Sequence, residues 1–101
     1  MNLTLESGSV ISSATERDLR DRIEGEEFAI LAADQHTYLQ CAKQNDAPNA
    51  YVLEFQEGDL ANHYRAVDDA VPFDRVIATF IKYLRGDESW KSDFVWQRVE
   101  L

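Results

Sequence analysis

The segment from residue 72 to residue 85 has the most regular hydrophobic pattern in the chain. Its apolar side chains recur at spacings of three and four residues: Phe73, Val76, Ile77, Phe80, Ile81 and Leu84. This spacing predicts an amphipathic helix with a broad buried face. Pro72 suits the first turn of such a helix, and Gly86 suits its end. Any fold of this chain must therefore provide a second layer on which that face can pack.

Strand patterns fill most of the remaining sequence. Alternating or short apolar segments predict strands at residues 2–6, 28–33, 36–42, 50–56, 60–67 and 93–101. Turn-forming residues separate several of them, notably at 44–49 and 57–59. A capping-box pattern from Ser13 to Glu16 predicts a second, shorter helix over residues 13–24. Short turns between successive strands favour an antiparallel arrangement.

The predicted element order is β-α-β-β-β-β-α-β. This order is typical of an α+β domain, with a mostly antiparallel sheet of five or six strands and two helices packed on one face. Two helices leave the second face of such a sheet partly open. The chain has 101 residues, with no repeat and no linker-like change in composition, so we expect residues 1–101 to form one domain.

The charge of the chain excludes one large class of function. Nineteen acidic residues against ten basic ones give a net charge of −9, so nonspecific binding to nucleic acid is not expected. No apolar run approaches the ~20 residues needed to span a bilayer, and the N-terminal residues do not resemble a signal peptide. We expect a cytoplasmic protein without a membrane partner. The lone Cys41 fits a reducing compartment, as a buried apolar residue or as a nucleophile activated by His36 or His63.

The sequence contains no phosphate-binding glycine loop, no nucleophile elbow and no metal-ligand spacing, so no cofactor, metal or catalytic residue is predicted. Glu54 is the most unusual carboxylate, because it lies inside a predicted strand between two apolar residues. His63 and Arg65 lie on the next predicted strand. These three residues form a candidate site on the open sheet face; the alternative is a structural ion pair across the strands.

Two further groups of residues suggest binding to a partner. Acidic pairs lie at the ends of predicted elements and could steer a basic partner, or could simply be solvated loop charges: Glu26, Glu27, Asp68, Asp69, Asp87 and Glu88. Aromatic residues with polar tips are numerous for a small domain, and they would serve as binding anchors or as core: Tyr38, Tyr51, Tyr64, Trp90 and Trp96.

The C-terminal half carries a motif of glycine, aromatic and apolar positions, made up of Glu54, Phe55, Gly58, His63 to Ala66, Val76, Phe80, Tyr83, Leu84, Gly86, Trp90, Phe94 and Trp96. In this motif the chain resembles a family of small uncharacterised bacterial α+β proteins. In layout it is also similar to predicted immunity proteins of bacterial toxin systems. The resemblance implies an α+β fold, and it transfers no functional residue.

These observations together favour a binding protein over an enzyme. The expected function is a non-catalytic protein-binding domain, of the immunity type that neutralises a basic toxin. One alternative is a small-molecule or enzymatic site on the open sheet face, built from Glu54, His63 and Arg65. Another is a homodimeric domain that associates through a sheet edge or face.

Overall fold

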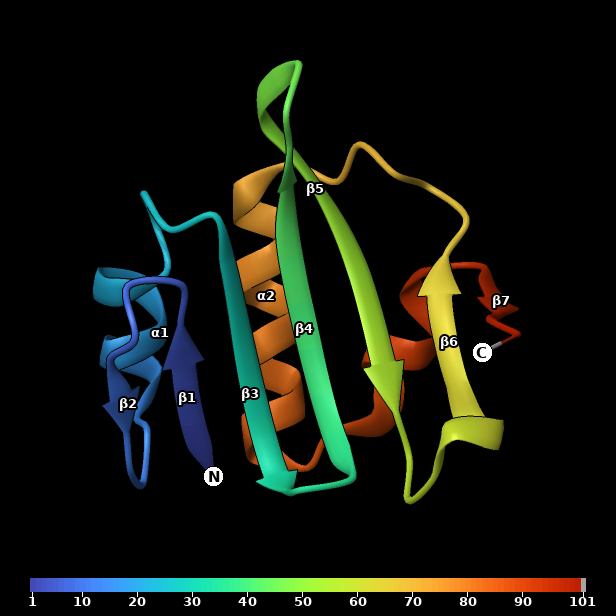
Figure 1. Cartoon of the computed structure of the whole chain (residues 1–101), viewed down its shortest axis with the longest axis horizontal. Helices are drawn as coiled ribbons and strands as arrows, with labels where there is room; N and C mark the ends of the chain where they lie inside the picture. Colours follow the sequence, from blue (N-terminus) through green and yellow to red (C-terminus); the bar gives the residue numbers. More distant parts are fainter. Residues whose placement is uncertain (101) are drawn as a thin grey trace.

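A computed structural model of the protein describes residues 1–100, except for the side chain of Pro48. Seven strands form one antiparallel sheet in the order β2-β1-β3-β4-β5-β6-β7, and both α-helices lie behind it (Figure 1). The α+β class and the antiparallel sheet are as predicted. The strands are β1 (Asn2–Leu5), β2 (Val10–Ile11), β3 (Phe28–Asp34), β4 (Thr37–Gln44), β5 (Ala47–Gln56), β6 (His63–Ala66) and β7 (Trp96–Arg98). The helices are α1 (Glu16–Arg22), α2 (Phe73–Arg85) and the 3₁₀ helices η1 (Leu60–Asn62) and η2 (Glu88–Asp93).

Helix α2 forms as its sequence pattern predicts. Val76 and Phe80 are fully buried on its inner side, where they join the core built by the sheet. Gly86 ends the helix in the left-handed conformation, with φ of 74°. A residue without a Cβ atom adopts that conformation at little cost, which explains why the helix ends there.

The N-terminal part of the fold differs from the prediction in two ways. The short strand β2 adds a seventh strand beyond the predicted five or six, and it pairs with β1. Helix α1 begins later than predicted, because Thr15 and Asp18 form the capping box: the Asp18 amide donates to the Thr15 hydroxyl, and the Thr15 amide donates to the Asp18 carboxylate. Ser13, the predicted cap, instead lies in a turn with φ of 53°.

Several predicted strand boundaries are also wrong. Strand β5 begins at Ala47, because the two residues 45–46 suffice to close the β4–β5 hairpin. Strand β6 covers only four residues, since residues 60–62 form the 3₁₀ helix η1. The predicted strand over residues 93–101 is reduced to β7, because Asp93 belongs to η2 and residues 94–95 and 99–100 do not form strand; Leu101 lies outside the described residues.

The two faces of the sheet have different surroundings. Along β5, Tyr51, Leu53 and Phe55 point into the core beneath the helices, as the alternation predicts. The intervening Val52, Glu54 and Gln56 point to the opposite side. Among the described residues, no helix lies over that opposite side (Figure 1). We call it the uncovered face, and it contains the predicted site.

Candidate functional site

A buried polar network occupies one part of the uncovered face. The register places His63 of β6 opposite Gln56 of β5. The Gln56 side-chain nitrogen donates to the backbone carbonyl of His36 at 3.1 Å, which turns the Gln56 oxygen toward His63. His63 Nδ1 lies 3.1 Å from the Gln56 oxygen. The Tyr38 hydroxyl donates to the same Gln56 oxygen at 3.3 Å. On the other side of the ring, His63 Nε2 lies 2.9 Å from Glu54 Oε1.

The acceptors around His63 determine what its ring can do. The Gln56 oxygen can only accept, so His63 Nδ1 is the donor in that bond. The other ring nitrogen, His63 Nε2, contacts the Glu54 carboxylate. Both ring nitrogens are thus engaged inside the sheet, and His63 is only 5% exposed. Neither nitrogen is free to exchange a proton with a bound substrate, so the geometry favours a structural role for this pair.

Arg65 behaves differently from the two residues with which it was grouped. It lies directly opposite Glu54 in the β5–β6 ladder, as predicted. Its side chain is exposed and forms no ion pair within residues 1–100, because the Glu54 carboxylate contacts His63 instead. Tyr38 completes the network: partial burial, and then the nearby Glu54 carboxylate, raise the pKa of its hydroxyl. Tyr38 therefore remains a neutral donor at neutral pH.

An apolar row crosses the same face near the end of the sheet where β4 meets β5. Phe28 of β3 pairs with Ala42 of β4, which pairs in turn with Val52 of β5. Beyond them, the amide of Val67 donates to the carbonyl of Val95 at 2.8 Å. Ala66 and Trp96 face the core, so by alternation Val67 and Val95 face the uncovered side. We define the apolar row as these five residues.

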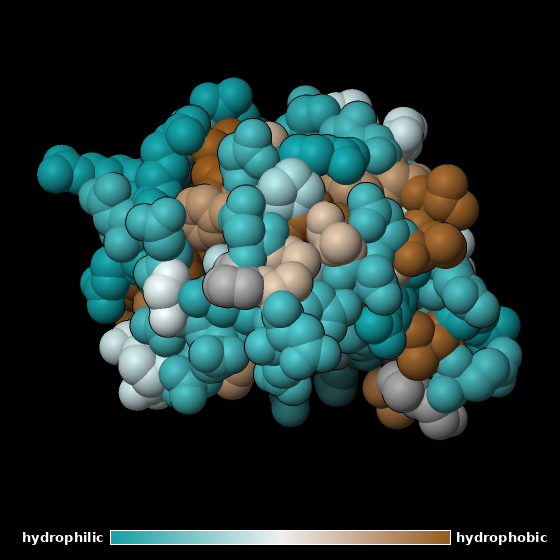
Figure 2. Space-filling view, turned by 90° about the horizontal axis from the view of Figure 1, so that it is seen from above, coloured by the Kyte–Doolittle hydropathy of each residue, from teal (hydrophilic) through white to brown (hydrophobic). Residues whose placement is uncertain are grey.

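Part of the apolar row is open to solvent. Phe28 is 37% exposed, Val67 is 59% exposed and Val95 is 72% exposed. Figure 2 looks down on this end of the sheet and shows hydrophobic atoms gathered at the side where β6 and β7 lie, among hydrophilic neighbours. Sequence analysis missed this row. Its members lie on different strands, so only the strand register brings them together.

The six predicted steering acids divide between the two ends of the sheet. Four lie beside the apolar row in the chain, with Glu26 and Glu27 before Phe28, and Asp68 and Asp69 after Val67. Two of these carboxylates also hold loops: Glu26 accepts from Ser7, and Asp68 accepts from the amide of Ala70. Glu27 and Asp69 are exposed.

The other two acids, Asp87 and Glu88, follow the C-terminus of α2. Asp87 accepts from the amide of Ser89, and this backbone hydrogen bond is the main cause of its lowered pKa. Glu88 pairs with Lys91. Both have local structural partners, so the sheet end that bears the apolar row is the better candidate for steering.

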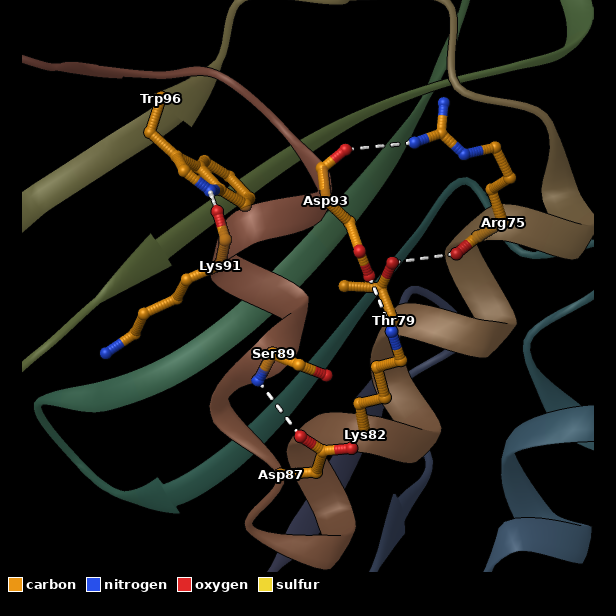
Figure 3. Close-up of polar contacts among 8 residues, drawn as sticks. All are labelled: Arg75, Thr79, Lys82, Asp87, Ser89, Lys91, Asp93 and Trp96. Atoms are coloured by element: carbon orange, nitrogen blue, oxygen red, sulfur yellow. Dashed lines mark hydrogen bonds and ion pairs between the residues drawn. The ribbon is translucent and has the colours of Figure 1, made fainter.

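Most of the predicted aromatic anchors belong to the core. Tyr51 and Trp90 are 3% exposed, and Tyr64 and Trp96 pack partly buried against the core. Only Tyr38 lies on the uncovered face. Figure 3 shows how η2 is held: the Trp96 indole donates to the carbonyl of Lys91 at 2.9 Å, and Lys82 pairs with Asp93 at 2.7 Å. These contacts fix Trp90 and Lys91 between α2 and β7.

Three hollows in the surface lie away from the predicted site. They have volumes of about 190 to 270 Å³ and lie beside α2, and none is lined by Glu54, His63 or Arg65. Within residues 1–100, no group of three or more His, Cys, Asp or Glu side chains is placed to hold a metal ion. No helix in the described part of the chain is long and apolar enough to cross a membrane.

Cys41 is buried in the core, and burial raises the pKa of its thiol to about 12. The thiolate is the reactive form, so we expect Cys41 to stay unmodified by a disulfide-exchange reagent at pH 8 in the folded protein. Absorbance of the released thiolate would report the reaction. The same protein unfolded in urea serves as the control and should react fully. Fast reaction of the folded protein would contradict the buried placement and restore Cys41 as a candidate nucleophile.

Comparison of the chain with protein-family models, curated proteins and solved structures found no match. The resemblance of the C-terminal half to small bacterial and immunity proteins therefore stays a prediction.

Proposed function

We propose that this protein is a non-catalytic binding domain that takes a basic partner protein on its uncovered face. The observation that carries the proposal is the apolar row, whose Val67 and Val95 are 59% and 72% exposed on a face that no described helix covers. An apolar centre with a charged rim is the usual anatomy of a protein interface.

The charge of the chain indicates the kind of partner. The net charge is −9, and four acids flank the apolar row in the sequence. Complementary charge speeds association and rejects partners of like charge, so a basic protein is the partner best suited to this end of the sheet. An immunity protein that neutralises a cationic toxin is the specific form of the proposal. The predicted resemblance supports the same form.

The two alternatives have less support. A catalytic site would need a free proton carrier, and both nitrogens of His63 are engaged by Gln56 and Glu54. A small-molecule site would need a hollow at Glu54, His63 and Arg65, and none of these residues lines the three hollows beside α2. A homodimer through the apolar row would compete with a basic partner for the same surface, and sedimentation velocity at increasing concentration separates these two cases.

Binding to the basic proteins encoded beside its gene tests the proposal. Each candidate is purified, and its association with the immobilised domain is followed in real time at low and high salt. The wild-type protein should bind one of them with an association rate that falls as salt rises, because salt screens the steering charges. The double variant Val67→Ser/Val95→Ser should weaken binding by about tenfold or more, since it removes the apolar centre.

Leu60→Ser is the matched control for the double variant. Leu60 is 62% exposed, a fraction similar to those of Val67 and Val95. It lies on η1, outside the apolar row. Its replacement should leave binding unchanged. Equal losses in the two variants would contradict the assignment of the interface. Failure of every neighbouring basic protein to bind the wild-type chain would contradict the proposed function.

A further inference from the structure

A hollow of about 190 Å³ lies beside the C-terminal end of α2, where Tyr83 and Gly86 line it. This end of the sheet is opposite the apolar row. The residues that line the hollow include the aromatic Tyr83 and Trp90 and the charged Glu57, Glu88 and Lys91. The volume equals about six water molecules, which suits a single side chain or a small organic ion rather than a larger ligand.

The chain itself shows which chemistry this hollow accepts. The ammonium of Lys91 lies 2.8 Å from Glu57 Oε1 and 3.2 Å from Glu88 Oε2. The same ammonium lies 5.6 Å from the centre of the Trp90 ring, within the range of a cation–π contact. Two carboxylates and an aromatic face therefore already surround one cation at the edge of the hollow.

The carboxylates beside the hollow favour a positive group between them. Two carboxylates contact the single ammonium of Lys91. Burial, and then the charges of Glu57 and Asp34, raise the pKa of the Tyr83 hydroxyl to about 12. For Lys91, partial burial lowers the pKa, but the hydrogen bonds with Glu57 and Glu88 outweigh burial and raise it. The raised pKa of Lys91 reflects its two carboxylate partners, whereas the raised pKa of Tyr83 is due mainly to burial.

We propose that this hollow binds a cationic group, an ammonium or guanidinium on an alkyl stem, and that Lys91 is its internal occupant. The stem would lie along Tyr83 and Trp90, and the charged head would take the place of the Lys91 ammonium between Glu57 and Glu88. The Lys91 side chain is 30% exposed, so it can swing into water when a ligand displaces it. This site is separate from the uncovered face and does not depend on the proposed function.

A titration with n-butylammonium tests the proposal, followed through the indole N–H signals of Trp90 and Trp96 by NMR. 1-Butanol is the neutral control, with the same stem and no charge. The wild-type protein should bind butylammonium weakly and 1-butanol not measurably. Lys91→Met removes the internal competitor and should bind butylammonium about tenfold more tightly, because a tethered competitor acts at an effective concentration on the order of millimolar.

Three further variants separate the site from general charge effects. Lys91→Arg keeps a cation in place and should bind no more tightly than the wild type. Glu57→Gln, added to Lys91→Met, should abolish the gain in affinity for butylammonium. Glu24→Gln, added to the same background, is the matched control; Glu24 is an exposed carboxylate at the other end of the sheet, and its loss should leave the gain intact. Circular dichroism confirms that each variant is folded.

A lysine-containing tripeptide distinguishes the two sources of such a cation. Binding of the tripeptide as well as butylammonium supports a site that accepts a cationic side chain of another protein. Binding of butylammonium alone supports a site for a free organic amine. The proposal is overturned if butylammonium shifts neither indole signal in folded wild-type protein and Lys91→Met, or if 1-butanol binds equally well.

Discussion

Phe80→Ala should lower the free energy of unfolding by about 3–5 kcal/mol, the usual cost of removing a buried phenylalanine ring. Phe80 has no solvent exposure and lies in the middle of α2, against the sheet. A small domain has only about 5–15 kcal/mol of stability in total, so the variant should be partly unfolded near its physiological temperature. Urea unfolding followed by circular dichroism measures the change.

Two variants of the same helix serve as controls for Phe80→Ala. Phe80→Leu keeps most of the volume and should cost less than about 1.5 kcal/mol. Ala78→Ser alters an exposed position of α2 and should stay within about 0.5 kcal/mol of the wild type. Similar effects of Phe80→Ala and Ala78→Ser would show that the Phe80 side of α2 does not pack against the sheet. The two faces of the sheet could then not be divided into one covered by helices and one uncovered.

Trp90→Ala should also lower the free energy of unfolding by about 3–5 kcal/mol, although Trp90 lies in a short 3₁₀ helix and not in an α-helix or strand. Its ring is 3% exposed and contacts three other aromatic rings, with centroids 4.9 Å from Phe55, 5.5 Å from Tyr83 and 5.7 Å from Trp96. Aromatic pairs in such edge-to-face contacts add stability beyond the area that they bury. Urea unfolding measures this change as well.

The control for Trp90→Ala is Ser92→Ala, an exposed position of the same 3₁₀ helix that should change stability by less than about 0.5 kcal/mol. Trp90→Phe keeps an aromatic ring in the cluster and should cost less than the alanine variant. A loss below 1 kcal/mol in Trp90→Ala would show that η2 is peripheral to the core. The hollow that it lines would then lack a fixed wall.

Periodic elements could be predicted from the sequence, and local irregularities could not. Helix α2 and the alternation of β5 follow from hydrophobic spacing, because burial on one side determines both patterns. The start of α1 was misplaced because Ser13 and Thr15 both offer a capping hydroxyl, and only the backbone geometry distinguishes them. The 3₁₀ helix η2 (Glu88–Asp93) has no periodic signal, so sequence patterns predict no element over residues 88–92 and place only Asp93 in the final strand.

For the candidate site, the sequence predicts which strands are neighbours, but not which side chains contact one another. The sequence pattern places Glu54 and His63 on neighbouring strands, and their side chains are in contact because β5 pairs with β6. The contact of Glu54 with His63 in place of Arg65 depends on side-chain reach, which sequence patterns do not encode. Phe28, Val67 and Val95 are far apart in the chain and share a surface only through the register of several strands.

The margins of the sheet bear on how the molecule behaves in a crowded solution. β2 has two residues and β7 has three, while the central strands are much longer. Edge strands this short offer few free backbone donors and acceptors to a neighbouring chain. Short edge strands are a known protection against aggregation through sheet edges. A molecule of this kind can expose hydrophobic side chains to water and still resist association through its sheet edges.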